Sequence, residues 1–101
     1  MPDLTFAIFE PLLGKSFRFQ VGEERTVELA LIEAVRLPVR TGAAPAGRRQ
    51  EPFSLVFRGP KGFLLPQRSY CVDQESLGTF DLFVVPINPD AEAYRYEALF
   101  N

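Results

Sequence analysis

The chain contains no histidine, no tryptophan and a single cysteine. Without histidine it cannot build the Ser-His-acid or Cys-His arrangements that activate a nucleophile, and a zinc ion would have to rely mainly on carboxylate ligands. The lone thiol, Cys71, excludes a disulfide within the chain, and we expect it to act as a small apolar residue, buried or half-buried, in a reducing compartment. We therefore expect a protein that is not an enzyme and has no catalytic residue, metal or cofactor.

Long apolar runs and an excess of one charge are missing as well. No apolar stretch approaches the roughly 20 residues of a membrane-spanning helix, and the first residues lack the basic and apolar segments of a signal peptide. Eleven basic and thirteen acidic residues leave a net charge of −2, which gives no general attraction to nucleic acids or anionic lipids. We expect a cytoplasmic protein that binds neither nucleic acid nor membranes.

Apolar residues recur at every second position over much of the chain, which is the period of a β-strand with one buried face. They make up 47% of the sequence, enough for one compact core. Breaks rich in glycine, proline and polar residues separate the alternating runs. The predicted strands span residues 15–21, 26–37, 53–58, 67–73, 79–85 and 94–100. We expect an all-β, mainly antiparallel fold: a small barrel or two-sheet sandwich of about six strands with a short N-terminal helix.

Two of the predicted strands depart from simple alternation. Leu31 and Ile32 stand side by side, so that either both faces are covered there or a bulge shifts the register. Phe83 and Val85 alternate with the other apolar residues of their strand, which predicts a central strand covered on both faces.

The N-terminal residues favour a short helix. Three apolar residues are spaced to share one helical face: Phe6, Phe9 and Leu13. Pro11 limits the helix to one or two turns, which we expect to end at Gly14 and to close one open end of the β fold.

Residues 38–52 are rich in proline, glycine and alanine and are predicted to form a long flexible loop. Neither half of the chain could bury a core alone, so the sequence predicts a single domain over residues 1–101.

Most carboxylates fall in predicted turns, where water solvates them; Glu23 and Glu24 are an example. Such positions favour a surface role over the paired acids of general acid–base catalysis. Arg58 and Glu97 fall at solvent-side positions of strands that could be neighbours, which predicts an ion pair between the two strands.

Two groups of residues are candidates for binding. The first could contact a protein partner or a second copy of the chain: Phe63, Leu64, Leu65, Phe83, Arg48 and Arg49. The alternative is that the long loop or the N-terminal helix covers the apolar residues of this group. The second group could face a small molecule or saccharide at the mouth of a barrel: Tyr70, Tyr94 and Tyr96.

Short motifs spread over nearly the whole chain carry a resemblance. They are FEPLLGKSF at 9–17, PFSLVFRGP at 52–60, LPQ at 65–67 followed by Tyr70, LG at 77–78, LF at 82–83, VP at 85–86 and YEALFN at 96–101. Together they resemble a family of short bacterial proteins known as a domain of unknown function. The resemblance implies no established activity, cofactor or catalytic residue. It does imply a neighbourhood of phage-tail-collar-like or tail-fibre-like genes, which favours a role in assembly.

The sequence thus favours a non-catalytic structural or protein-interaction module over an enzyme. We expect it to act through sheet edges and exposed apolar residues, in an accessory part of a larger, phage-tail-like assembly. The alternative function is that of a small-molecule or saccharide-binding β barrel, which would use the three tyrosines.

Overall fold

The computed structural model describes residues 4–37, 52–62, 64–87 and 93–100. These residues form the helix α1 (Phe6–Phe9), the 3₁₀ turn η1 (Glu10–Leu12) and six strands: β1 (Ser16–Gln20), β2 (Thr26–Arg36), β3 (Phe53–Pro60), β4 (Arg68–Gln74), β5 (Gly78–Ile87) and β6 (Ala93–Phe100). Three predicted contact residues, Phe63, Arg48 and Arg49, and nearly all of the predicted loop lie outside the described residues. No described helix has the length and apolar character needed to cross a lipid bilayer.

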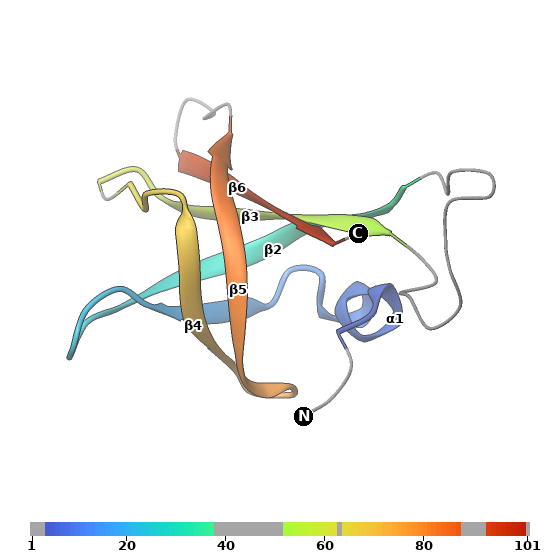
Figure 1. The fold of residues 1–101 in the computed structure, drawn as a ribbon, viewed down its shortest axis with the longest axis horizontal. Coiled ribbons are helices and arrows are strands. Elements are labelled where there is room, and N and C mark those ends of the chain that lie inside the picture. The colour runs from blue at the N-terminus through green and yellow to red at the C-terminus, as the bar shows by residue number, and fades with distance from the viewer. Residues whose placement is uncertain (1–3, 38–51, 63, 88–92, 101) are drawn as a thin grey trace.

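The six strands form a closed barrel in the order β1-β2-β3-β6-β5-β4, in which β4 pairs with β1 (Figure 1). All neighbouring strands in this order are antiparallel. The prediction of an antiparallel all-β fold with a short N-terminal helix is therefore confirmed. Of the two predicted architectures, the chain adopts the barrel.

Side chains alternate between the interior and the outside of the barrel along each strand. In β1, for example, Phe17 and Phe19 are buried while Ser16, Arg18 and Gln20 are exposed. The inward residues form one apolar core: Phe17, Phe19, Leu29, Leu31, Phe53, Leu55, Phe57, Tyr70, Val72, Phe80, Leu82, Val84, Tyr96 and Ala98. Burying a side chain of this size contributes about 1.5–3 kcal/mol, so the aromatic interior is the main source of stability.

α1 closes one end of the barrel, as predicted (Figure 1). The Phe9 side chain is fully buried, and its ring centroid lies 5.8–6.2 Å from the ring centroids of four strand residues: Phe17, Phe53, Phe80 and Phe100. These separations are typical of attractive aromatic pairs. The helix therefore belongs to the same core as the strands.

The predicted buried face of this helix is wrong at one position. Leu13 is 43% exposed, and Leu12 is buried in its place. The reason is that Pro11 lies in the 3₁₀ turn η1, where residues three positions apart share a face, so that Leu12 follows Phe9 on the inner side. The segment then ends at Gly14, as predicted, and the positive φ of 85° at this residue is the left-handed conformation that glycine adopts readily.

β2 contains the bulge that the sequence allowed as one of two options. The pairing of β2 with β3 shifts register between Leu31 and Glu33, and Ile32 is 39% exposed. Beyond this extra residue the outward positions of β2 change from even to odd numbers, so that Val35 points outward.

The prediction that β5 is covered on both faces is wrong at Phe83, which is 49% exposed. Its outer face packs against no further sheet in the described part of the chain.

The barrel wall opens between β5 and β6. These strands pair over residues 85–87 and 95–97, whereas the β3–β6 pairing extends over both strands and the β4–β5 pairing over the whole of β4. Beyond the pair Val85–Glu97 the two strands separate, and α1 lies at the opening between them (Figure 1). The ring of Phe9 bridges this opening through its contacts with Phe80 of β5 and Phe100 of β6.

Candidate functional site

The end of the barrel opposite α1 is covered by the segment that connects β3 to β4. Leu65 in this segment is 1% exposed, and its backbone N–H donates a hydrogen bond of 2.9 Å to the hydroxyl of Tyr96. The hydroxyl of Tyr70 donates a hydrogen bond of 2.6 Å to the carbonyl oxygen of Pro66. Two tyrosines that the sequence suggested as ligand-facing therefore hold a connecting segment of their own chain over the barrel end.

Burial raises the pKa of the Tyr70 and Tyr96 hydroxyls above the ordinary value of 10.0. The guanidinium of Arg68 offsets part of this rise in the pKa of Tyr70, and the hydrogen bond from Leu65 offsets part of it for Tyr96. Both phenols are thus neutral near pH 7 and engaged with backbone groups. The third residue of this group, Tyr94, is half-buried and packs against the edge of the core.

The predicted contact segment 63–65 divides into two different environments. Leu64 is 48% exposed and could contact another molecule, whereas Leu65 belongs to the core and offers almost no accessible area. The sequence missed this division because Leu65 is drawn inward by the Tyr96 hydroxyl, a contact between residues 31 positions apart. Phe83, the remaining described residue of this group, lies on the outside of β5 as expected for a contact residue.

The outside of the barrel carries an apolar row across three neighbouring strands. The register places Val35 of β2 opposite Ser54 of β3, and Ser54 opposite Leu99 of β6. Val35 is 43% and Leu99 55% exposed, whereas Ser54 between them is only 7% exposed. We call these three residues the outer apolar row. Val35 and Ser54 were not among the candidate residues, although the alternation in β3 and the bulge phase in β2 were signals that could have revealed them.

A second row follows two residues further along the same strands. Val56 of β3 is 6% exposed, and it lies between Glu33 of β2 and Glu97 of β6. Glu97 in turn faces Val85 of β5. The outer apolar row is therefore bordered on one side by two carboxylates with a buried valine between them.

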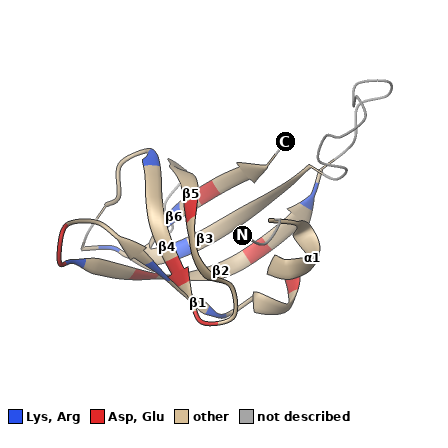
Figure 2. Ribbon diagram, turned by 60° about the horizontal axis from the view of Figure 1, so that its bottom comes forward, with Lys and Arg blue, Asp and Glu red and all other residues tan. Residues whose placement is uncertain are grey.

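The charges on this face pair differently from the prediction. Arg58 lies opposite Arg95, and Glu97 lies opposite Val56, so the predicted partners Arg58 and Glu97 are diagonal rather than direct neighbours. An ion pair on this face joins Arg95 to Glu33 across 3.8 Å, with both side chains partly exposed. Over the described strands, basic and acidic residues are interspersed (Figure 2). The face therefore has no field of a single sign.

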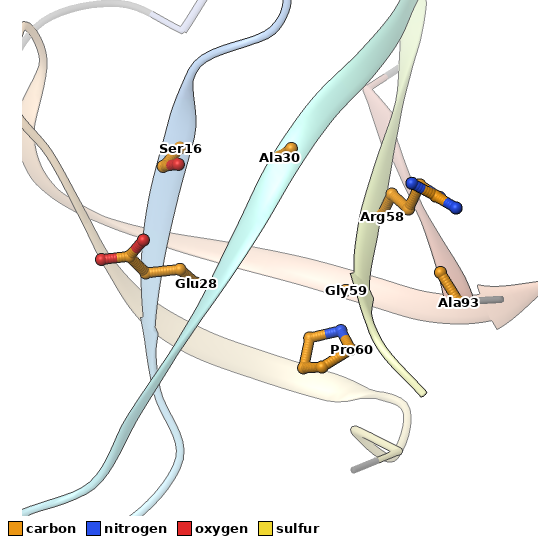
Figure 3. A pocket seen from close by; sticks show the side chains of 7 residues that line it. All are labelled: Ser16, Glu28, Ala30, Arg58, Gly59, Pro60 and Ala93. Atoms are coloured by element: carbon orange, nitrogen blue, oxygen red, sulfur yellow. The ribbon is translucent and has the colours of Figure 1, made fainter. Parts of the chain in front are cut away.

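An open hollow of about 470 Å³ lies beside this face. Small residues line much of it, and Glu28 and Arg58 extend in opposite directions away from its centre (Figure 3). Gly59 lines it as well, but the α-hydrogen that a side chain would replace faces the core, where an added methyl group would collide with the Leu29 side chain. A binding site for a small polar molecule requires polar groups that converge on it, and the two charged groups here diverge.

The described surface also carries Cys71 and acidic residues, the types that could ligate a metal ion. In the described part of the chain, cysteine and acidic residues do not gather in groups of three or more that could hold a metal ion. Cys71 is exposed, and the expectation that it is buried or half-buried is wrong. Its neighbours Tyr70 and Val72 point into the barrel, and the strict alternation of β4 sends the thiol outward.

The comparisons with known proteins address the family of the chain. A family model described as a domain of unknown function, DUF6916, matches residues 4–100. Neither a curated protein nor a solved structure matches the chain. The match covers all strands, the helix and the connections between them, and it confirms the predicted resemblance to a family of unknown function. The chain therefore belongs to the DUF6916 domain family.

Proposed function

We propose that this protein is a non-catalytic structural or protein-interaction module that binds a protein partner through the outer apolar row. The observation that carries the proposal is the alignment of Val35 and Leu99 on either side of Ser54. Val35 and Leu99 lie on the two strands that flank β3, and each of these two side chains is more than two-fifths exposed. Isolated exposed aliphatic residues are ordinary, but here two of them flank a small serine in register, so that one partner can cover both at once. Such a strip stabilises a complex when a partner removes it from water.

The packing of the interior supports a function on the outside. Large side chains that are less than 2% exposed fill the barrel, among them Phe9, Phe57 and Tyr96. The ends are covered by α1 and by the segment that contains Leu65. A saccharide or small-molecule site at the barrel mouth would need free tyrosine hydroxyls, and those of Tyr70 and Tyr96 are bonded to the backbone. The described residues thus favour the interaction module over the alternative binder.

We take the partner to be a component of a larger, phage-tail-like assembly of bacterial origin, because the sequence motifs resemble proteins encoded near such genes. A cytoplasmic location fits an exposed, unpaired Cys71, since a reducing compartment keeps an accessible thiol free. A surface strip without catalytic groups suits an accessory part of an assembly, where area and shape matter more than reactivity.

The proposal is tested by capture from the native host with matched variants. Leu99→Arg places a charge in the outer apolar row, whereas Leu13→Arg makes the same change at a residue of similar exposure elsewhere, at 43%. Leu64→Arg tests the exposed residue of the β3–β4 segment in the same way. Circular dichroism and thermal melting establish that all three variants remain folded.

We expect a defined protein to be recovered by the wild type and by Leu13→Arg and to be lost with Leu99→Arg. Mass spectrometry identifies it, and reconstitution with the purified partner measures the loss of affinity. Recovery that is equal for the wild type and Leu99→Arg would refute the role of this surface. Loss with Leu64→Arg alone would move the binding site to the β3–β4 segment.

A further inference from the structure

Where β5 and β6 separate, one stretch of the β5 backbone pairs with a described strand on a single side. Residues 79–84 of β5 pair with β4 on one side, and the β5–β6 pairing begins only at Val85. We call the other side of residues 79–84 the open edge. If the antiparallel register continued, Phe83 would face Leu99, but the strands have diverged there.

The opening beside this edge is bridged by side chains rather than by a further described strand. Phe9 reaches across it from α1 to contact Phe80 and Phe100, so the core beneath is sealed from water. A β-strand edge offers a row of backbone N–H and C=O groups, whose natural partner is another extended backbone. The chemistry of the open edge therefore fits an extended peptide segment better than any other class of partner.

The side chains on the outer face of this edge indicate which segment would fit. Phe83 is 49% exposed, and Asp81, two positions away on the same face, is also exposed. Asp81 makes no ion pair with the described residues, whereas Asp73 on the neighbouring strand β4 is engaged by Arg18 at 3.8 Å. Directly opposed side chains on adjacent strands stabilise a sheet when they are both apolar or of opposite charge. An added strand would therefore carry an apolar residue beside Phe83 and a basic residue beside Asp81.

A second copy of the chain fits the open edge less well. In an antiparallel pair the facing residues share one face of the sheet. When both barrels lie on the same face of the joint sheet, the two registers that pair most of residues 79–84 with their counterparts would place Asp81 opposite Asp81 or opposite Phe83 of the other copy. The first register brings like charges together and the second buries a carboxylate against a phenyl ring, and both arrangements are unfavourable.

We propose that the open edge of β5 binds an extended segment of a partner protein by strand addition, and that the segment carries a basic residue next to Asp81 and an apolar residue next to Phe83. This inference rests on the proposed function and names the chemistry of the partner. It also gives the partner a way to extend over the outer apolar row, because Leu99 lies on the strand across the opening.

The test uses the exposed thiol of Cys71 as an attachment point. Cys71 lies opposite Asp81 on β4, so an added strand beyond β5 would run about 10 Å away, or two strand spacings. A peptide of alternating threonine and valine with a central lysine is joined to the thiol through a maleimide and a short glycine linker, which spans this distance. Tethering raises the effective concentration of the peptide to the millimolar range, so that weak pairing is measurable.

Three tethered molecules serve as controls: the linker alone, the peptide with glutamate in place of lysine, and the lysine peptide with N-methyl groups on alternate amides. Hydrogen exchange, followed by NMR, reports on the backbone amides of residues 79–84 that do not bond to β4. We expect the lysine peptide to slow their exchange by roughly tenfold or more relative to the linker alone. The glutamate peptide should protect them roughly three- to tenfold less, and Asp81→Asn should remove this difference.

Exchange rates that the lysine peptide leaves unchanged would overturn strand addition, as would equal protection by the N-methylated peptide. If the amides of residues 79–84 become more protected as the concentration of the protein without a peptide rises, and light scattering detects a dimer, the edge pairs with a second copy. The outcome is separable from the proposed function. If Leu99→Arg loses the partner but the lysine peptide protects no amides, the protein is an interaction module that does not bind by strand addition. If the lysine peptide protects the amides but Leu99→Arg still recovers the partner, the open edge binds a strand and the outer apolar row is not the binding surface.

Discussion

Tyr96→Phe is the substitution that best tests how the barrel end is closed. It removes one oxygen atom from a side chain that is fully buried and leaves the phenyl ring in the core. That oxygen accepts the hydrogen bond from the backbone N–H of Leu65 at 2.9 Å. Leu65 is itself 1% exposed, so water has little access to the N–H that the substitution would leave without its acceptor.

The expected cost follows from this burial. A buried donor that loses its partner destabilises a protein by about 1–3 kcal/mol, because its full desolvation is no longer offset. Tyr70→Phe should cost less, about 0.5–1.5 kcal/mol, because it frees a carbonyl oxygen of the exposed residue Pro66, which water can reach. The two substitutions remove the same atom from the same residue type, but Tyr96→Phe orphans a buried N–H donor whereas Tyr70→Phe orphans an exposed carbonyl acceptor.

Urea denaturation followed by circular dichroism measures both costs, and Tyr94→Phe is the matched control. Tyr94 is half-buried, and its hydroxyl forms no hydrogen bond with the described residues, so we expect a change within about 0.5 kcal/mol. For a small domain, a loss of about 2 kcal/mol lowers the urea midpoint by roughly 1–2 M. A Tyr96→Phe midpoint equal to that of Tyr94→Phe would refute the conclusion that this hydroxyl holds the barrel end closed.

Two further predictions concern the core and its response to pH. Gly59→Ala should destabilise the fold by about 1–3 kcal/mol, because the new methyl group collides with the buried Leu29 side chain. Gly62 has open space around it, so Gly62→Ala should change stability by less than about 0.5 kcal/mol in the same denaturation assay. The raised pKa values of Tyr70 and Tyr96 predict full stability below pH 10 and a progressive loss above it, because the unfolded phenols ionise at their ordinary pKa of 10.0 while the folded ones remain neutral. Urea midpoints measured from pH 8 to 11.5 test this, and a flat profile above pH 10 would contradict it.

The strands and their inward faces could be predicted from the sequence because alternation is a local signal. Phe17 and Phe19, or Tyr70 and Val72, are two positions apart, and the pleat alone decides that they share a face. The same rule applied to Cys71 predicts an exposed thiol, although the residue type suggested a buried one. Where pattern and residue type disagree, the backbone geometry decides the orientation.

The candidate site could not be predicted from the sequence to the same extent, because it depends on pairing between strands that are far apart in the chain. The outer apolar row exists because β3 lies between β2 and β6, an order that places Ser54 next to both Val35 and Leu99. Alternation shows that each residue points outward but not which residues become neighbours. The same limit explains the error at Leu65, whose burial depends on Tyr96 of the last strand.

The closure of the barrel explains why the gap between β5 and β6 is a candidate for binding. A barrel removes the edges that an open sheet would expose, and here four of the six strand junctions do so over most of the shorter strand: β1–β2, β2–β3, β3–β6 and β4–β5. The junctions β1–β4 and β5–β6 each pair three residues on each strand, and at β5–β6 the aromatic ring of Phe9 bridges the remaining gap. A ring excludes water from the core but forms no backbone hydrogen bonds, so the core is complete while the pairing of β5 is not. A partner strand at the open edge would supply the backbone hydrogen bonds that the aromatic ring cannot form.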